Sequence, residues 1–107
     1  MLPENIFLKK LQSIARAIIT NQVAMPLGAM KIDKLIFQAQ KSEAFKNLDL
    51  GIIKEYVSQF NGCPVGPERF RWDKEALKEQ DKHLDLLTAK YKDRILDKCF
   101  DILTRSF

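Results

Sequence analysis

The chain has 107 residues, of which 46% are hydrophobic and 30% are charged, and its formal net charge is +4. This composition is that of a soluble globular protein, and seven Phe with few Gly or Pro exclude disorder as the main state. No apolar run approaches the roughly 20 residues that a membrane-spanning helix needs, which excludes a transmembrane segment. We therefore predict a single domain over residues 1–107.

The positive charge lies in the first two thirds of the chain. Residues 1–71 carry ten basic and six acidic side chains, whereas residues 72–107 carry eight of each. Nucleic-acid binding generally requires clustered Lys and Arg, and the densest basic positions here are only Lys9-Lys10 and the pair Arg69 and Arg71. A solvated basic surface is therefore favoured, and a helical nucleic-acid-binding module that uses the basic N-terminal half is the alternative.

The cysteines and the first residues bear on the compartment of the protein. Cys63 and Cys99 lie 36 positions apart, and with a single histidine they cannot complete a zinc site. We expect reduced thiols, because the N-terminal residues lack the basic start and apolar stretch of a secretory signal. The protein is accordingly predicted to be cytoplasmic and to bind neither a metal nor a cofactor.

Two helices are predicted in the N-terminal part of the chain. Residues 6–20 place apolar side chains at intervals of three and four, and residues 26–41 repeat that pattern. Gly28, in the first turn of the second helix, costs about 1 kcal/mol relative to Ala. This cost indicates either the close approach of another backbone or an imperfect helix start. Residues 42–48 are predicted to be a break.

A third helix and an irregular segment follow. Residues 49–60 have a clean apolar face, and Asp49 is the predicted N-cap of that helix. Residues 61–72 contain two Pro and two Gly within six positions, which argues against regular structure. Phe70 and Trp72 are costly to leave exposed, so we expect a loop that packs on the helices through these two rings.

The last helix is predicted to be long. It begins after the N-cap Asp73 and continues to about Thr104 without Gly or Pro. Roughly 30 residues at 1.5 Å each give a rod of about 45 Å, which exceeds the diameter of a domain this size. The helix must therefore bend or break near residues 80–83, or its start must project past the other helices. The predicted fold class is all-α, a small irregular bundle of four to five helices with one ordered Pro/Gly-containing loop.

The sequence offers few side chains for catalysis. His83, the single histidine, lies in a polar turn that we expect to be exposed, and Cys63 has no base near it in the sequence. Asp93, Asp97 and Asp101 share a helix face, but basic side chains surround them. A salt-bridged outer face is therefore favoured over a metal-binding strip. Core packing is expected for most of the Phe side chains, and we predict no enzymatic activity.

The most distinctive stretch begins at Pro64. It reads Pro64-Val65-Gly66, then Arg69, Trp72, Glu75-Ala76-Leu77 and Asp81. With Ile14-Ala15-Arg16 and Gly28-Ala29 upstream, it resembles small helical bacterial immunity proteins of toxin–immunity systems, including those of contact-dependent growth inhibition. The resemblance implies a protein that binds and neutralises a cognate toxin domain by direct contact. The chain lacks the acidic run that such proteins carry before the Pro-x-Gly turn, which argues against a basic nuclease as the toxin.

An immunity protein needs a rigid scaffold and a complementary surface with aromatic or Arg anchors. Residues 61–72 bring such side chains together, and the predicted partner-binding residues are Glu68, Arg69, Phe70 and Arg71. The alternative is that these charges are simply solvated and the rings pack on the helices. For Trp72, packing on the helices is favoured over contact with a partner.

Overall fold

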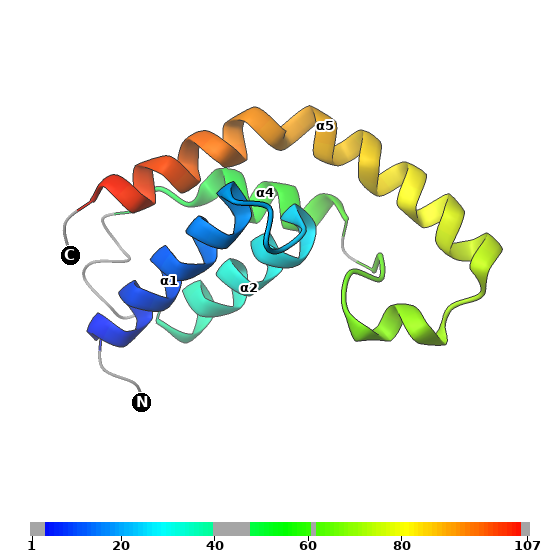
Figure 1. Cartoon of the computed structure of the whole chain (residues 1–107), viewed down its shortest axis with the longest axis horizontal. Coiled ribbons are helices and arrows are strands. Elements are labelled where there is room, and N and C mark those ends of the chain that lie inside the picture. The colour runs from blue at the N-terminus through cyan, green and yellow to red at the C-terminus, as the bar shows by residue number, and fades with distance from the viewer. Residues whose placement is uncertain (1–3, 40–47, 61, 106–107) are drawn as a thin grey trace.

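The computed structural model describes residues 4–39, 48–60 and 62–105, and within them the protein is all-α, as predicted. Its elements are α1 (Glu4–Ile19), α2 (Met25–Gln38), α4 (Gly51–Gln59), the short 3₁₀ helix η1 (Pro67–Arg71) and α5 (Lys74–Thr104). α1 and α2 lie side by side, and α5 arches over them and over α4, with which it also packs (Figure 1). No helix among the described residues is long and apolar enough to cross a membrane.

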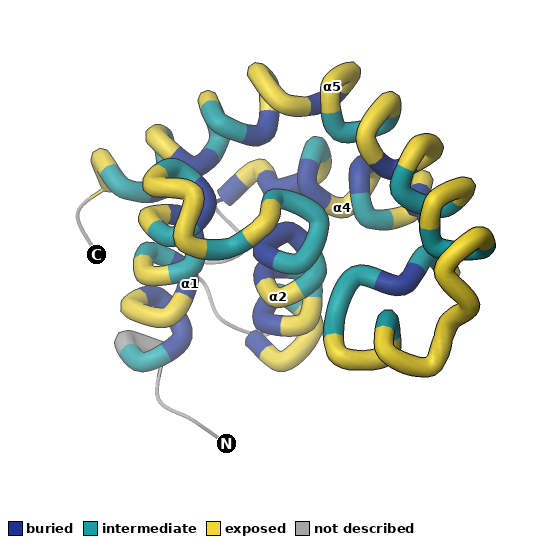
Figure 2. The backbone as a smooth tube through the Cα atoms, turned by 45° about the vertical axis from the view of Figure 1, so that its right-hand side comes forward, coloured by how far each residue is buried: buried dark blue, intermediate teal, exposed yellow. Residues whose placement is uncertain are grey.

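The core is enclosed by the inward faces of the α-helices among the described residues. Figure 2 shows that the buried residues lie along the sides of α1, α2 and α4 that face the interior and along the underside of α5. The largest side chains with less than 2% of their surface exposed are Tyr56, Phe60, Leu11, Ile32, Ile53, Ile95, Ile102 and Cys99. Burial of each large apolar side chain contributes about 1.5–3 kcal/mol, so this shared core dominates the stability of the bundle.

The turn between α1 and α2 depends on Asn21 and Gly28. Asn21 has a φ of 60°, a left-handed conformation that Asn tolerates better than most residues. A Cβ on Gly28 would lie 2.5 Å from Cγ1 of Ile18, so the glycine makes room for that side chain. The close approach expected from the sequence therefore exists, but a side chain of α1 makes it rather than a backbone.

The predicted helix boundaries differ from the observed ones by a few residues. α4 begins at Gly51, and its N-cap is Leu50 rather than the predicted Asp49. The Asp49 carboxylate still accepts a hydrogen bond from the Gly51 amide at 3.2 Å. α2 ends at Gln38 rather than at residue 41. The break predicted at 42–48 lies almost wholly outside the described residues.

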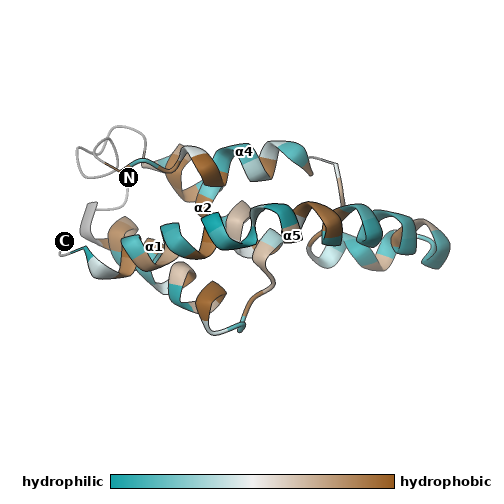
Figure 3. Cartoon of the chain, turned by 90° about the horizontal axis from the view of Figure 1, so that it is seen from above, coloured by the Kyte–Doolittle hydropathy of each residue, from teal (hydrophilic) through white to brown (hydrophobic). Residues whose placement is uncertain are grey.

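α5 is one continuous helix, so the alternative of a break near residues 80–83 is wrong. Its N-cap is Asp73, as predicted, and the carboxylate accepts from the Ala76 amide at 3.4 Å. Its 31 residues match the longest extent of the molecule, 44 Å. A helix of this length is accommodated because it curves and because its start projects past α1 and α2 (Figure 1). That projecting end is mostly hydrophilic, as Figure 3 shows, which is why it needs no partner helix.

Several aromatic rings lie outside the core, contrary to the prediction. Phe70 is 94% exposed, so this ring does not anchor the loop, whereas Trp72 keeps only 37% of its surface exposed. Phe37 and Phe100 are also exposed, at 73% and 52%. Phe37 follows the buried Leu35 by two positions, which places it about 200° around the helix and toward solvent. The loop does not depend on Phe70, because polar contacts hold it instead.

Candidate functional site

The loop before α5 is folded by its own side chains. The Glu68 carboxylate accepts hydrogen bonds from the backbone amides of Val65 at 3.1 Å and Gly66 at 3.2 Å. Hydrogen bonds from backbone amides lower the pKa of Glu68. A Cβ on Gly66 would lie 2.9 Å from Oε2 of Glu68, so the glycine leaves space for the carboxylate. The Pro and Gly residues were predicted to prevent regular structure here, but they build a compact turn that contains the 3₁₀ helix η1.

A bidentate ion pair fixes this loop to α5. Nη1 and Nη2 of Arg69 donate to the two carboxylate oxygens of Asp81 at 2.8 and 2.9 Å, and Nη1 also donates to the Pro64 carbonyl at 3.1 Å. The hydrogen bonds between them raise the pKa of Arg69 and lower the pKa of Asp81. Paired, parallel hydrogen bonds define an orientation as well as a distance. The Arg69–Asp81 pair therefore sets how the loop lies on the helix.

The outer side of the loop is apolar and basic. Phe70 is almost fully exposed, Trp72 directly follows η1, and Arg71 between them is exposed. Within the part of the chain that the structure describes, Arg71 forms no ion pair. An exposed aromatic ring beside a free guanidinium has the composition typical of anchor residues in protein interfaces. We refer to Phe70, Arg71 and Trp72 as the loop tip.

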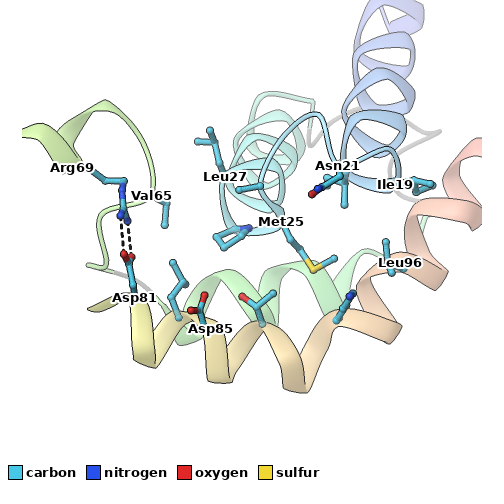
Figure 4. Close-up of a pocket in the computed structure, with 15 residues that line it drawn as sticks. Ile19, Asn21, Met25, Leu27, Val65, Arg69, Asp81, Asp85 and Leu96 are labelled. Atoms are coloured by element: carbon cyan, nitrogen blue, oxygen red, sulfur yellow. Dashed lines mark hydrogen bonds and ion pairs between the residues drawn. The ribbon is translucent and has the colours of Figure 1, made fainter. Parts of the chain in front are cut away.

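A groove of about 730 Å³ opens beside the loop. Its floor is the middle of α5, one wall is the turn from α1 into α2, and the loop forms the opposite wall through Val65 and Arg69 (Figure 4). Met25 extends from the start of α2 toward α5, as Figure 4 shows. Most of the walls are apolar, and the apolar residues that line them are Ile18, Ile19, Ala24, Met25, Pro26, Leu27, Val65, Leu84 and Leu96.

The floor of the groove carries a short row of polar side chains. Asp81, Asp85, Thr88 and Lys92 follow one another along one face of α5. Asp81 is occupied by Arg69, and the Thr88 hydroxyl lies 2.7 Å from the Tyr56 hydroxyl. Asp85 and Lys92 are exposed, and neither forms an ion pair among the described residues. The floor thus presents one free negative and one free positive charge.

The cysteines and acidic residues that the sequence offered as candidates for chemistry contribute to hydrogen bonds, packing and ion pairs. Cys63 and Cys99 are free thiols. The Cys63 thiol donates to Oε1 of Gln80 at 3.1 Å, and burial raises its pKa, so it is held in the protonated form. Asp101 pairs with Lys98 at 3.5 Å and Arg105 at 3.4 Å. Among the described residues, no group of three or more His, Cys, Asp or Glu side chains could hold a metal ion.

The four predicted partner-binding residues divide into two pairs. Glu68 and Arg69 are engaged within the loop and with α5, whereas Phe70 and Arg71 face outward. Whether any of them contacts a partner stays a prediction. The groove was not predicted from the sequence. The spacing of Asp81, Asp85, Thr88 and Lys92 on one helix face was the available signal, but the wall opposite them comes from a turn some 60 residues away.

Comparisons with protein-family models, with curated proteins and with solved structures found no match for this chain.

Proposed function

We propose that the chain is a binding protein that acts by direct contact with another protein, and most concretely that it is an immunity protein that neutralises a cognate bacterial toxin domain. The observation that carries the proposal is the loop tip. Phe70 is 94% exposed although it lies on a loop that internal hydrogen bonds and the Arg69–Asp81 ion pair hold in place. A large apolar ring displayed on an ordered support is typical of a contact surface.

The energetics favour a protein partner for this surface. Burying a Phe side chain contributes about 1.5–3 kcal/mol, and an anchor of this kind can carry much of the free energy of binding. Because the loop is already ordered, association does not have to freeze it, which lowers the entropic cost of binding. Inhibition by an immunity protein requires only such contact, which covers the active site of the toxin or a surface that the toxin needs.

The test is a pull-down from the native bacterium with the tagged chain at moderate salt, read by mass spectrometry. We expect one near-stoichiometric protein to be retained, and the double variant Phe70→Ala with Trp72→Ala to lose it. Leu86→Ala is the matched control, because Leu86 is 75% exposed on α5, outside the loop. Co-expression of the chain should then relieve the toxicity of the captured protein's toxic domain. The proposal is contradicted if the loop-tip double variant retains the same protein as the wild type, or if co-expression gives no protection.

The same experiment addresses the nucleic-acid alternative. Lys9, Lys10 and Arg16 are exposed on α1, and Lys31 and Lys34 are exposed on α2. If these side chains bind phosphates, affinity should fall steeply with salt, by close to one power of the salt concentration for each phosphate contacted. Recovery of nucleic acid alone, released by modest salt and unaffected by the loop-tip variant, would replace the immunity function with that alternative.

A further inference from the structure

The groove between α5 and the turn from α1 into α2 is a second contact surface beside the loop tip. The two share the loop, because Val65 and Arg69 line the groove and the next residue after Arg69 is Phe70. We propose that this groove binds an amphipathic helical segment of the partner protein. Asp85 and Lys92 would set the orientation of that segment. This inference rests on the proposed function, since it names the part of the partner that the protein would recognise.

The apolar part of the groove fits an apolar helix face. Met25 and Leu27 are half-buried, as are Ile19 and Val65, so a docked segment would cover surface that is still partly exposed. A Met side chain adapts to irregular apolar partners because it is unbranched and flexible. The groove volume of about 730 Å³ has room for several side chains that point from one face of a helix.

The free charges give the occupant its polarity. Asp85 and Lys92 are seven positions apart, which is about two turns or 10.5 Å along α5. A partner helix alongside α5 would meet them with a cationic side chain opposite Asp85 and an acidic one opposite Lys92, also seven positions apart. Such complementarity fixes the direction of the docked segment and rejects the reversed one.

A helix fits this groove better than an extended strand. Strand addition needs an exposed sheet edge that offers backbone hydrogen bonds. The described walls and floor are helices and a loop, and the described residues contain no strand. The groove therefore offers side chains, and recognition by side chains is what an apolar stripe at helical spacing satisfies.

The test is selection of random 16-residue peptides displayed on phage against the full chain. We expect enriched peptides with apolar residues at positions i, i+3 or i+4, and i+7, and with a cation and an acid seven positions apart. The charge-reversed variant Asp85→Lys with Lys92→Glu should weaken the best peptide by about tenfold or more, measured by fluorescence anisotropy. The best peptide with its cation and acid exchanged should bind this variant more tightly than it binds the wild type.

Two further variants are controls for the specificity of peptide binding to the groove. Glu79→Lys with Lys82→Glu reverses an exposed pair whose side chains are 75% and 74% accessible, and it should leave peptide affinity unchanged. Phe70→Ala should leave it unchanged as well. The inference is overturned if no peptide is enriched, or if the enriched peptides lack a cation and an acid seven positions apart. It is also overturned if charge reversal in the groove has no effect, or if sedimentation shows a dimer that the groove reversal dissociates.

Failure of this inference and failure of the proposed function are separable. A captured partner that depends on Phe70 but binds the groove-reversed chain at full affinity contradicts the groove and leaves the binding function standing. A chain that retains no protein partner contradicts the proposed function, whatever peptides the groove selects.

Discussion

Gly28 shows how the absence of one side-chain atom fixes the approach of two helices. It is buried near the start of α2, where a Cβ would lie 2.5 and 2.8 Å from Cγ1 and Cδ1 of Ile18 and 3.2 Å from Cγ1 of Val23. Cγ1 of Ile18 is close to the helix backbone and cannot move freely. Helix propensity would favour Ala here by about 1 kcal/mol, so packing rather than local preference explains the glycine.

We expect Gly28→Ala to destabilise the protein by about 1–2 kcal/mol, because overpacking typically costs about 1–3 kcal/mol and the gain in helix propensity returns only part of it. Urea unfolding followed by circular dichroism measures the change. Gly51→Ala is the control. Gly51 is exposed, and the nearest atom to a Cβ there is Oδ1 of the Asp49 side chain at 3.2 Å. A Gly28→Ala protein as stable as the wild type would show that Ile18 relaxes without cost.

Cys99 gives the stability of the protein a dependence on alkaline pH. Burial raises its pKa from 9.0 to about 11. Between these values the unfolded chain loses the thiol proton while the folded chain keeps it, so the free energy of unfolding falls as pH rises. At about 1.4 kcal/mol per pKa unit, the loss is on the order of 2–3 kcal/mol by pH 11.

The measurement is urea unfolding between pH 7 and 10.5 for the wild type and Cys99→Ala. Other groups titrate in this range, including Tyr56, whose pKa is raised by burial. Those groups are common to both proteins, so the difference between the two curves isolates Cys99. We expect the wild type to lose its advantage over Cys99→Ala above pH 9. Parallel curves across the range would mean that the thiol ionises in the folded protein at its ordinary pKa.

The elements show which parts of the structure local sequence can predict. Helical periodicity and the Asp73 cap predicted α1, α2, α4 and α5 to within a few residues, because those signals lie within a turn or two of their effect. The structure of the loop was predicted only in part. Its composition predicted an irregular and ordered segment, but Phe70 was wrongly expected to anchor it, since 94% of its surface is exposed. The true anchor joins Arg69 to Asp81 across 12 positions, and no periodic pattern reveals such a pair.

The Arg69–Asp81 pair should control the order of the loop more than the stability of the whole protein. Its side chains are 36% and 41% exposed, and exposed ion pairs contribute little to global unfolding. Asp81→Asn removes the charge at nearly constant size, so we expect faster amide hydrogen exchange in residues 65–72 with little change in the urea midpoint. Mass spectrometry of the exchanged peptides measures the effect.

Asp85→Asn is the matched control for this change. It makes the same substitution one helical turn later, at a side chain that forms no ion pair among the described residues. Amide hydrogen exchange in the loop should be unchanged in the Asp85→Asn variant. Arg69→Lys should behave like Asp81→Asn, because an ammonium cannot reproduce the paired hydrogen bonds of a guanidinium. Equal loop protection in all these proteins would show that the turn built by Glu68 is sufficient to order the segment.

At the scale of the whole molecule, packing is unevenly distributed along α5. The buried residues of this helix are Leu84, Tyr91, Ile95, Cys99 and Ile102, and none of them precedes residue 84. The C-terminal end is further tied to α1, because Nε2 of Gln12 donates to the carbonyls of Ile102 at 3.3 Å and Arg105 at 3.1 Å. One continuous helix therefore has a supported end and a projecting end.

Since most helical stability in proteins comes from packing, the projecting end should open locally while the rest stays folded. We expect amides of residues 78–83 to exchange well before those of residues 95–102, whose opening approaches the free energy of global unfolding. Asp73→Ala, which removes the N-cap at a cost of about 0.5–2 kcal/mol, should speed exchange only in the first part of α5. Uniform protection along α5 would mean that the loop and the Arg69–Asp81 pair support the projecting end as fully as the core supports the other.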